Sequence, residues 1–199
     1  MTDKYAIWDI DETLISASIK DISTPFLTDP NVFYIQPIIY PSPVEIWIRK
    51  HFHECINSLK MKGYKFIIWS AGEETYVKAI ISVLFKNVEI THLFTREHTT
   101  KYPYTDNGRT EYEYVKILKN IEQHIPGFKR ENCRLIDDNP CHIKEGQEHL
   151  IITCPKFSRK DTECSYLRNL PDIIDAHFSL KSSTNLPVDF KPSVNNQAL

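Results

Sequence analysis

The sequence predicts an α/β fold in which helices cover both faces of a mostly parallel β-sheet. Short apolar, β-prone runs alternate along the chain with stretches of helical periodicity, and this order is typical of βαβ units. The 199 residues fit one domain with a tail, and a composition of 41% hydrophobic and 25% charged residues is that of an ordinary globular protein. We therefore expect one folded domain over residues 1–179 and a disordered tail, poor in apolar anchors, over residues 180–199.

The first elements are predicted from apolar runs and from periodicity. The apolar run that begins at Tyr5 predicts a buried strand, whereas residues 15–30 mix Ser, Thr, Asp and Pro and predict a surface loop. Residues 32–39 are β-prone but contain a proline, which favours an edge strand. Apolar residues recur every three or four positions over 44–61, which predicts a helix. Gly63 is expected to end that helix.

The rest of the chain continues the alternation. Between residues 99 and 112, the tripeptide Asp106-Asn107-Gly108 is a tight-turn signal with β-prone flanks, so a small hairpin is expected there. Around it we expect strands at 64–69, 88–95, 133–136 and 150–153, and helices at 73–85, 114–125 and 165–178.

Composition excludes several classes of protein. The formal net charge of −2 gives no electrostatic reason to expect binding to nucleic acid or anionic membranes. The five cysteines are odd in number and form no C-x-x-C pair, which suits a reducing compartment better than a disulfide framework or a zinc site. The start of the chain leads directly into the first strand, without a signal peptide, and no apolar stretch reaches membrane-spanning length. We therefore expect a cytoplasmic or nuclear protein, of undetermined oligomeric state.

The strongest functional motif follows the first strand. Asp9 and Asp11 stand one residue apart, and because side chains alternate along a strand, both carboxylates start on the same side. Two carboxylates held this close need either a cation between them or a shared proton. Mg²⁺ is the natural cation, since it binds through one or two carboxylates together with a substrate phosphate.

Two further strands are followed by polar residues of the same kind. Ser70 follows the strand at 64–69, and Asp137 and Asp138 follow the strand at 133–136. In open α/β sheets ligands bind at the carboxyl ends of the strands. The sequence therefore predicts that these side chains and the first aspartates form one site.

These residue types suit phosphoryl transfer. Asp9 could attack a phosphate monoester and form an aspartyl phosphate that water then hydrolyses, while Asp11 could protonate the leaving oxygen and later deprotonate the water. Ser70, at a strand-to-helix junction, could seat the phosphate. The transfer also needs a cation, for which spacing alone offers several candidates: Lys116, Lys78, Arg96 and Lys101.

Each of these residues also has a simpler interpretation. A serine before a helix is more often an N-cap, and a helical lysine such as Lys116 is more often a solvated charge. The tetrapeptide Asp137-Asp138-Asn139-Pro140 could be a turn and no more, because Asp, Asn and Pro all favour turns. Only their common order along the chain favours a site.

The motifs in that order resemble those of the haloacid-dehalogenase (HAD) superfamily. More closely, the chain is similar to the small phosphatases of the RNA polymerase II C-terminal domain (CTD), also called NLI-interacting-factor-like phosphatases. The resemblance runs from about residue 5 to residue 178. Its first motif is Asp9-Ile10-Asp11-Glu12-Thr13-Leu14. Four further motifs carry it: Trp69-Ser70-Ala71-Gly72-Glu73-Glu74-Thr75-Tyr76, Leu93-Phe94-Thr95-Arg96-Glu97-His98, Tyr114-Val115-Lys116-Ile117-Leu118 and Leu135-Ile136-Asp137-Asp138-Asn139-Pro140.

The resemblance implies a Rossmann-like three-layer sandwich with a small hairpin insertion and no large cap domain. It also implies roles for the residues: Asp9 the nucleophile, Asp11 the general acid/base and a metal ligand through its backbone carbonyl, Thr13 and Ser70 phosphate-binding, and Lys116 the neutralising cation. A Mg²⁺ site would be formed by Asp9, Asp11, Asp137 and Asp138. The resemblance does not decide which of Asp137 and Asp138 binds the ion directly.

Three positions depart from the family pattern. Asp138 stands where Asn is frequent, and Thr99 where Cys is frequent. Tyr40-Pro41 stands where Arg-Pro commonly precedes the helix, so the role of that arginine is expected to be lost or moved.

The expected substrate is phosphoserine or phosphothreonine in a protein. Between Thr13 and Ser70 there is too little chain for a lid domain, and an open site suits a macromolecule better than a small metabolite. The RNA polymerase II CTD is one candidate partner. Two alternatives stay open: a phosphatase of nucleic-acid 3′-phosphates or small phosphoesters, and a phosphopeptide-binding module without turnover.

Overall fold

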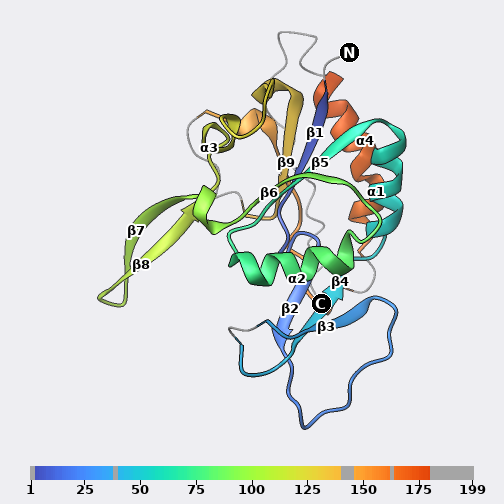
Figure 1. Ribbon diagram of the computed structural model, residues 1–199, viewed down its shortest axis with the longest axis vertical. Helices are drawn as coiled ribbons and strands as arrows, with labels where there is room; N and C mark the ends of the chain where they lie inside the picture. Colours follow the sequence, from blue (N-terminus) through green and yellow to red (C-terminus); the bar gives the residue numbers. More distant parts are fainter. Residues whose placement is uncertain (1–2, 38–39, 140–145, 162–163, 180–199) are drawn as a thin grey trace, which may run out of the picture.

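The protein is an α/β structure built on a five-stranded parallel sheet (Figure 1). The structure, a computed structural model, describes residues 3–37, 40–139, 146–161 and 164–179, so the tail expected at 180–199 lies outside the described residues. The strand order is β10-β9-β1-β5-β6, and every neighbouring pair is parallel. The strands are β1 (Lys4–Trp8), β5 (Tyr64–Trp69), β6 (Ile90–Phe94), β9 (Cys133–Asp137) and β10 (Ile151–Thr153).

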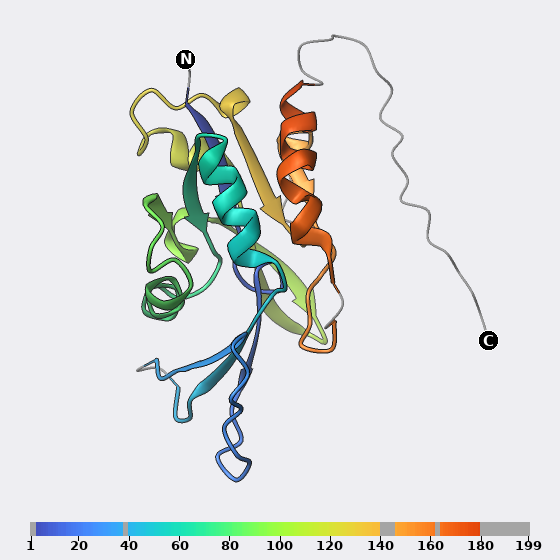
Figure 2. The same ribbon diagram turned by 90° about the vertical axis from the view of Figure 1, so that its right-hand side faces the viewer.

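Both faces of this sheet are covered, which confirms the predicted fold class. On one face Trp8, Phe66 and Ile68 pack in a core with apolar residues of α1 (Phe52–Met61), α2 (Glu74–Leu84) and α4 (Tyr166–Ser179). Figure 2 shows α1 and α4 side by side on that face. On the other face Ile7 and Leu135 pack in a second core with the segment around α3 (Lys119–Glu122). The central strands are therefore buried on both sides, which is why they are continuous apolar runs.

Four more predicted elements are confirmed to within a few residues. They are α2, α4, β6 and β10, and Gly63, at φ 78°, ends α1 in the left-handed conformation that suits glycine. No helix among the described residues has the length and apolar character needed to cross a membrane.

The segment between β1 and α1 contains a small antiparallel sheet that the sequence did not predict. Its order is β2-β4-β3, from β2 (Ile15–Ile19), β3 (Val32–Ile35) and β4 (Val44–Ile48). The expected loop at 15–30 therefore begins with a strand, and the expected helix at 44–61 begins only at Phe52. Two apolar residues four positions apart, such as Val44 and Ile48, lie on one face of a helix and also on one face of a strand, so the pattern did not distinguish the two. The expected edge strand is confirmed as β3.

The insertion after β6 is a hairpin longer than expected. It consists of β7 (Thr100–Asp106) and β8 (Arg109–Val115), and it projects from the body of the protein (Figure 1). Asn107 and Gly108 both have positive φ, 47° and 76°, as a two-residue type I′ turn requires. Thr100 pairs with Val115, so pairing extends into the region where a helix at 114–125 was expected, and only α3 is helical there. Lys116 consequently lies directly after a strand, and not in the first turn of a helix as predicted.

The helix α4 is fastened to the sheet by a polar cluster. Tyr64 Oη donates a hydrogen bond of 2.6 Å to Asp175 Oδ1, and Lys62 Nζ donates one of 2.7 Å to Asp175 Oδ2. Burial works to raise the pKa of Asp175, but the hydrogen bonds from Lys62 and Tyr64 outweigh it and hold the pKa below the ordinary 3.8.

We predict that Tyr64→Phe destabilises the protein by about 1 kcal/mol at neutral pH, because a partly exposed carboxylate loses a donor. A lowered folded-state pKa contributes stability that is complete above pH 3.8 and is lost as pH falls through the folded-state value. The cost should therefore shrink in acid, as measured by urea unfolding across this range. Tyr104→Phe, at an exposed hairpin position, is the control. An equal loss of unfolding free energy at neutral pH and in acid would contradict the role given to the Tyr64–Asp175 hydrogen bond.

Candidate active site

Three adjacent strand ends bring the predicted site residues together. The strands β9, β1 and β5 are neighbours, Trp8 lies in register with Ile136 and Ile68, and the Asp9 N–H donates to the Ile136 carbonyl at 3.0 Å. Because the strands are parallel, their carboxyl ends lie at one edge of the sheet. The polar residues at these three strand ends therefore lie close together, as the sequence predicted.

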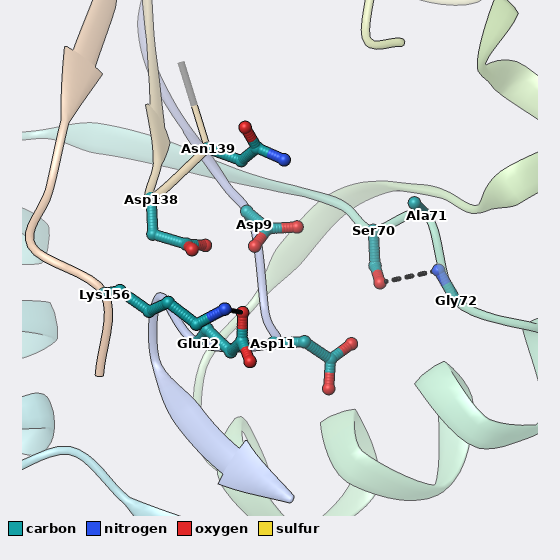
Figure 3. A pocket seen from close by; sticks show the side chains of 9 residues that line it. All are labelled: Asp9, Asp11, Glu12, Ser70, Ala71, Gly72, Asp138, Asn139 and Lys156. Atoms are coloured by element: carbon teal, nitrogen blue, oxygen red, sulfur yellow. Dashed lines mark hydrogen bonds and ion pairs between the residues drawn. The ribbon is translucent and has the colours of Figure 1, made fainter. Parts of the chain in front are cut away.

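A cleft of about 360 Å³ opens at this edge (Figure 3). Both aspartates of the first motif line it, as the alternation of side chains predicted. Its described lining residues are Asp9, Asp11, Glu12, Ser70, Ala71, Gly72, Asp138, Asn139 and Lys156.

The floor of the site is a buried ion cluster. The Lys116 ammonium is fully buried between Asp9 Oδ1 and Asp137 Oδ2, at 2.8 Å from the latter. Burial raises the pKa of Asp9 to about 7, although Lys116 opposes the rise, and Asp137 adds to it. Burial also works to lower the pKa of Lys116, but the two carboxylates outweigh it and raise that pKa. The lysine therefore keeps its charge.

The structure distinguishes Lys116 from the other three candidate cations. Lys78 pairs with Glu74 on the exposed side of α2, Arg96 pairs with Glu73, and Lys101 lies over the Tyr112 ring. Lys116 is positioned by the end of β8 and by Gln147, a residue that the sequence gave no reason to single out. The Gln147 amide donates to the Lys116 carbonyl at 2.6 Å and accepts from the Leu118 N–H at 2.9 Å.

Asp11 has a different neighbour from Asp9. Its Oδ1 accepts a hydrogen bond of 2.6 Å from Tyr76 Oη, on α2. Burial raises the pKa of Asp11, and the Tyr76 hydrogen bond opposes this. Tyr76 falls in the helix predicted at 73–85, but the sequence gave no reason to expect its contact with Asp11. Tyr40 packs beside Tyr76, with ring centroids 6.3 Å apart.

The two hydroxyl residues have different surroundings. Ser70 lines the cleft and accepts the Gly72 N–H at 3.0 Å. It is not the N-cap of α2, which is Glu73, so the simpler interpretation is wrong. A Cβ on Gly72 would lie 3.0 Å from Val77 Cγ2 and 3.1 Å from Ser70 Oγ, a crowding that favours glycine here. Thr13 is buried, and its hydroxyl donates to Asp138 Oδ1 at 2.9 Å and accepts from the Asp138 N–H at 3.1 Å.

Three carboxylates are placed to share a metal ion. One oxygen from each of Asp9, Asp137 and Asp138 lies within 4.8 Å of the others, and the Asp11 side chain is not part of this group. Carboxylate oxygens are the hard donors that Mg²⁺ prefers, so the residues present fit that ion. The Asn139 N–H donates to Asp137 Oδ1 at 2.9 Å. This hydrogen bond is that of a turn after Asp137, as the simpler interpretation expected. A turn alone would not bring Asp9 close to Asp137 and Asp138, however.

A buried arginine lies between β4 and α1. Because α1 begins at Phe52, the segment ahead of it contains Arg49. The guanidinium of Arg49 is fully buried and donates to the Thr13 carbonyl at 3.0 Å. It thereby joins the small sheet to the loop after β1.

Comparisons with known proteins agree with this fold. The family model described as NLI interacting factor-like phosphatase matches residues 4–183. A structure of Fcp1, an essential RNA polymerase II CTD phosphatase, is similar at 15% identity and TM-score 0.60, covering 90% of this chain and 50% of that one. An arginine variant of fission yeast Fcp1 bound to beryllium fluoride matches at 14% identity and TM-score 0.58, covering 90% and 51%. The chain thus spans about half the length of these structures, and at this identity they show the fold alone.

We predict that Lys116→Met lowers the free energy of unfolding by about 3–5 kcal/mol, because it leaves two buried carboxylates without their cation. Added Mg²⁺ should recover more stability in the variant than in the natural protein, since the ion would replace the missing charge. Thermal unfolding with and without MgCl₂ measures both effects. Lys119→Met, at an exposed position three residues further, is the matched control. Unchanged stability of Lys116→Met would contradict the importance of the ion cluster.

Proposed function

The chain belongs to the NLI interacting factor-like phosphatase family, and we propose that it is a magnesium-dependent phosphatase of phosphoserine or phosphothreonine in proteins. The observation that carries the proposal is the Lys116 ammonium, buried between Asp137 and Asp9, of which Asp9 lines the cleft. A positioned cation beside a carboxylate that faces a cleft supports attack of that carboxylate on phosphate.

In the first step Asp9 attacks phosphorus. A bond forms between its carboxylate oxygen and phosphorus, the bond to the seryl or threonyl oxygen breaks, and Asp11 gives a proton to that oxygen. The environments of the two residues support these unequal roles. Burial raises the pKa of both carboxyls, so the difference lies in their partners: Asp9 lies against the Lys116 ammonium, whereas Asp11 accepts from the neutral Tyr76 hydroxyl.

In the second step water attacks the phosphorus of the aspartyl phosphate. Asp11, now ionised, takes a proton from the water, and the bond between phosphorus and the Asp9 oxygen breaks. The products are inorganic phosphate and the free Asp9 carboxylate. Tyr76 donates to Asp11 in its ionised state and so stabilises the form that acts as the base.

A bound Mg²⁺ would balance the charge of the transferring phosphoryl group. We propose Asp9 and Asp138 as its carboxylate ligands, because both face the cleft. Asp137 is 1% exposed and accepts from Lys116, so its part is to hold the lysine. Thr13, whose hydroxyl bonds Asp138, would orient that ligand instead of touching phosphate. The proposed ligation by the Asp11 backbone carbonyl follows from the family resemblance.

Ser70 is the proposed seat of the phosphate. Its side chain and the backbone of Ala71 and Gly72 line the cleft just ahead of α2, and helix N-termini favour anions.

A protein substrate is favoured by what surrounds the cleft. The described chain between β1 and β5 forms a small sheet and α1, without a separate cap domain over the site. Fcp1, the similar solved structure, is described as an RNA polymerase II CTD phosphatase, so the CTD is a candidate substrate. The alternatives are a nucleic-acid 3′-phosphatase and a phosphopeptide-binding module. A net charge of −2 disfavours the first, and the complete set of proposed catalytic residues disfavours the second.

We predict that Asp9→Asn lowers kcat on an aryl phosphate by about 10⁴-fold or more, since an amide cannot replace the carboxylate nucleophile. Acid quenching with labelled substrate should trap a phosphoenzyme in the natural protein and none in the variant. Asp106→Asn, at the exposed hairpin turn, should behave like the natural protein. Full activity of Asp9→Asn would show that the covalent mechanism is wrong.

The substrate is tested with a panel of phosphoserine and phosphothreonine peptides, including serine-proline repeats, beside a 3′-phosphorylated oligonucleotide. We expect kcat/KM to be highest for a peptide, and turnover to stop on chelation of divalent metal and return with Mg²⁺. Preference for the oligonucleotide would overturn the substrate, and activity that survives chelation would overturn the metal. Binding of peptides without any turnover would favour the non-catalytic alternative.

A further inference from the structure

The segment after β10 carries three exposed cations past the cleft: Lys156, Arg159 and Lys160, which we call the basic strip. Its backbone is anchored to the site. The Cys154 N–H donates to the Asp137 carbonyl at 2.9 Å, and the Phe157 N–H donates to the Glu12 carbonyl at 2.6 Å. The segment is therefore fixed against the end of β9 and the loop after β1, which carry the site aspartates.

Lys156 stands at the cleft itself. It is the basic residue among the described residues that line the cleft, and its ammonium pairs with Glu12, as Figure 3 shows. The Lys156 and Glu12 side chains are 66% and 46% exposed. Water screens so exposed a pair, so a dianion of the substrate could replace the Glu12 carboxylate at little cost.

The other two cations extend the strip along the small sheet. Arg159 and Lys160 line a neighbouring hollow of about 540 Å³ with Lys20 and Trp47. Within the described chain, the acidic group in ion-pair range of Arg159 is Glu45, at 3.7 Å. That carboxylate already accepts hydrogen bonds from Tyr34 and Trp47. The Arg159 side chain is 57% exposed, so it stays accessible to a ligand.

The other side of the cleft has the opposite character. Gly72, across the cleft from Lys156 in Figure 3, leads into Glu73 and Glu74 at the start of α2. With Glu97 these line a hollow of about 480 Å³, where Arg96 is already paired with Glu73. Among its described lining residues, this hollow has three carboxylates against the two cations Arg96 and Lys101. The hollow beside the strip has three cations against one carboxylate, that of Glu45.

We propose that the basic strip is a second anion subsite, which binds a phosphate or carboxylate carried on the same polypeptide as the phosphate to be hydrolysed. The inference rests on the proposed phosphatase function. Because cations outnumber carboxylates in the hollow beside the strip and carboxylates outnumber cations in the hollow by α2, the subsite selects substrates with a second negative charge on one side of the target residue. The same charges should speed association, and the effect should weaken with salt.

The test uses labelled peptides with one central phosphoserine. A second phosphoserine, a glutamate or a serine is placed at successive positions on either side, and kcat/KM is measured at low ionic strength. We expect about a tenfold preference for a second charge on one side, the gain of one charge-assisted contact. A gain with both charged residues assigns the subsite to any oxyanion, and a gain with phosphoserine alone assigns it to phosphate.

The decisive variant replaces all three strip residues by glutamine. In this variant the ratio of kcat/KM for the doubly charged peptide to kcat/KM for the singly charged peptide should fall to about one. Thermal unfolding should stay unchanged, because the side chains are exposed. Lys86→Gln, an exposed lysine beyond α2, should keep the ratio. The same peptides are also bound to the Asp9→Asn protein and followed by fluorescence anisotropy.

The two hypotheses fail in distinguishable ways. Equal binding and turnover of singly and doubly charged peptides, or a preference that survives in the triple variant, would overturn the subsite and leave the phosphatase assignment intact. A charge preference in binding that depends on the strip, in a protein without turnover, would retain the subsite and reject the proposed function.

Discussion

The interaction on which the structure depends is the ion cluster of Lys116, Asp9 and Asp137. Its three members come from the end of β8, the end of β1 and the end of β9, and all are buried. Removing one partner of such a cluster leaves an uncompensated charge in a low dielectric, which costs more than the cluster itself contributes. The proposed catalytic arrangement and the packing of the sheet edge are thus stabilised by the same contacts.

Much of the peripheral chain positions this cluster. The hairpin delivers Lys116 directly from its second strand, and Gln147 fixes the lysine backbone. A second buried cation, Arg49, holds the Thr13 carbonyl, and Thr13 in turn holds Asp138. The small sheet is therefore linked to the proposed metal ligand through two hydrogen bonds. This linkage gives a physical reason for placing an antiparallel sheet beside a parallel one.

The sequence predicted the central strands because burial on both faces forces apolar runs, and it predicted the hairpin turn from Asn107-Gly108. It failed at 44–48 and 114–115, where strand pairing with distant segments overrides a pattern that also fits a helix. Convergence of the aspartates followed from parallel topology. The choice of Lys116 came from the family resemblance, and the partners Tyr76, Gln147 and Lys156 could not be predicted, since they come from separate elements.

Asp9 and Asp11 share a motif and a cleft, yet their surroundings differ in kind. Burial raises the pKa of both carboxyls. Only Asp9 has a buried ammonium against it, and a fixed positive charge stabilises an anion that must attack phosphorus. Asp11 has a neutral donor, Tyr76, which stabilises the carboxylate less and leaves it able to take up and release a proton. The proposed division between a nucleophile and a proton carrier therefore rests on one neighbour each, the lysine that follows β8 and a tyrosine from α2.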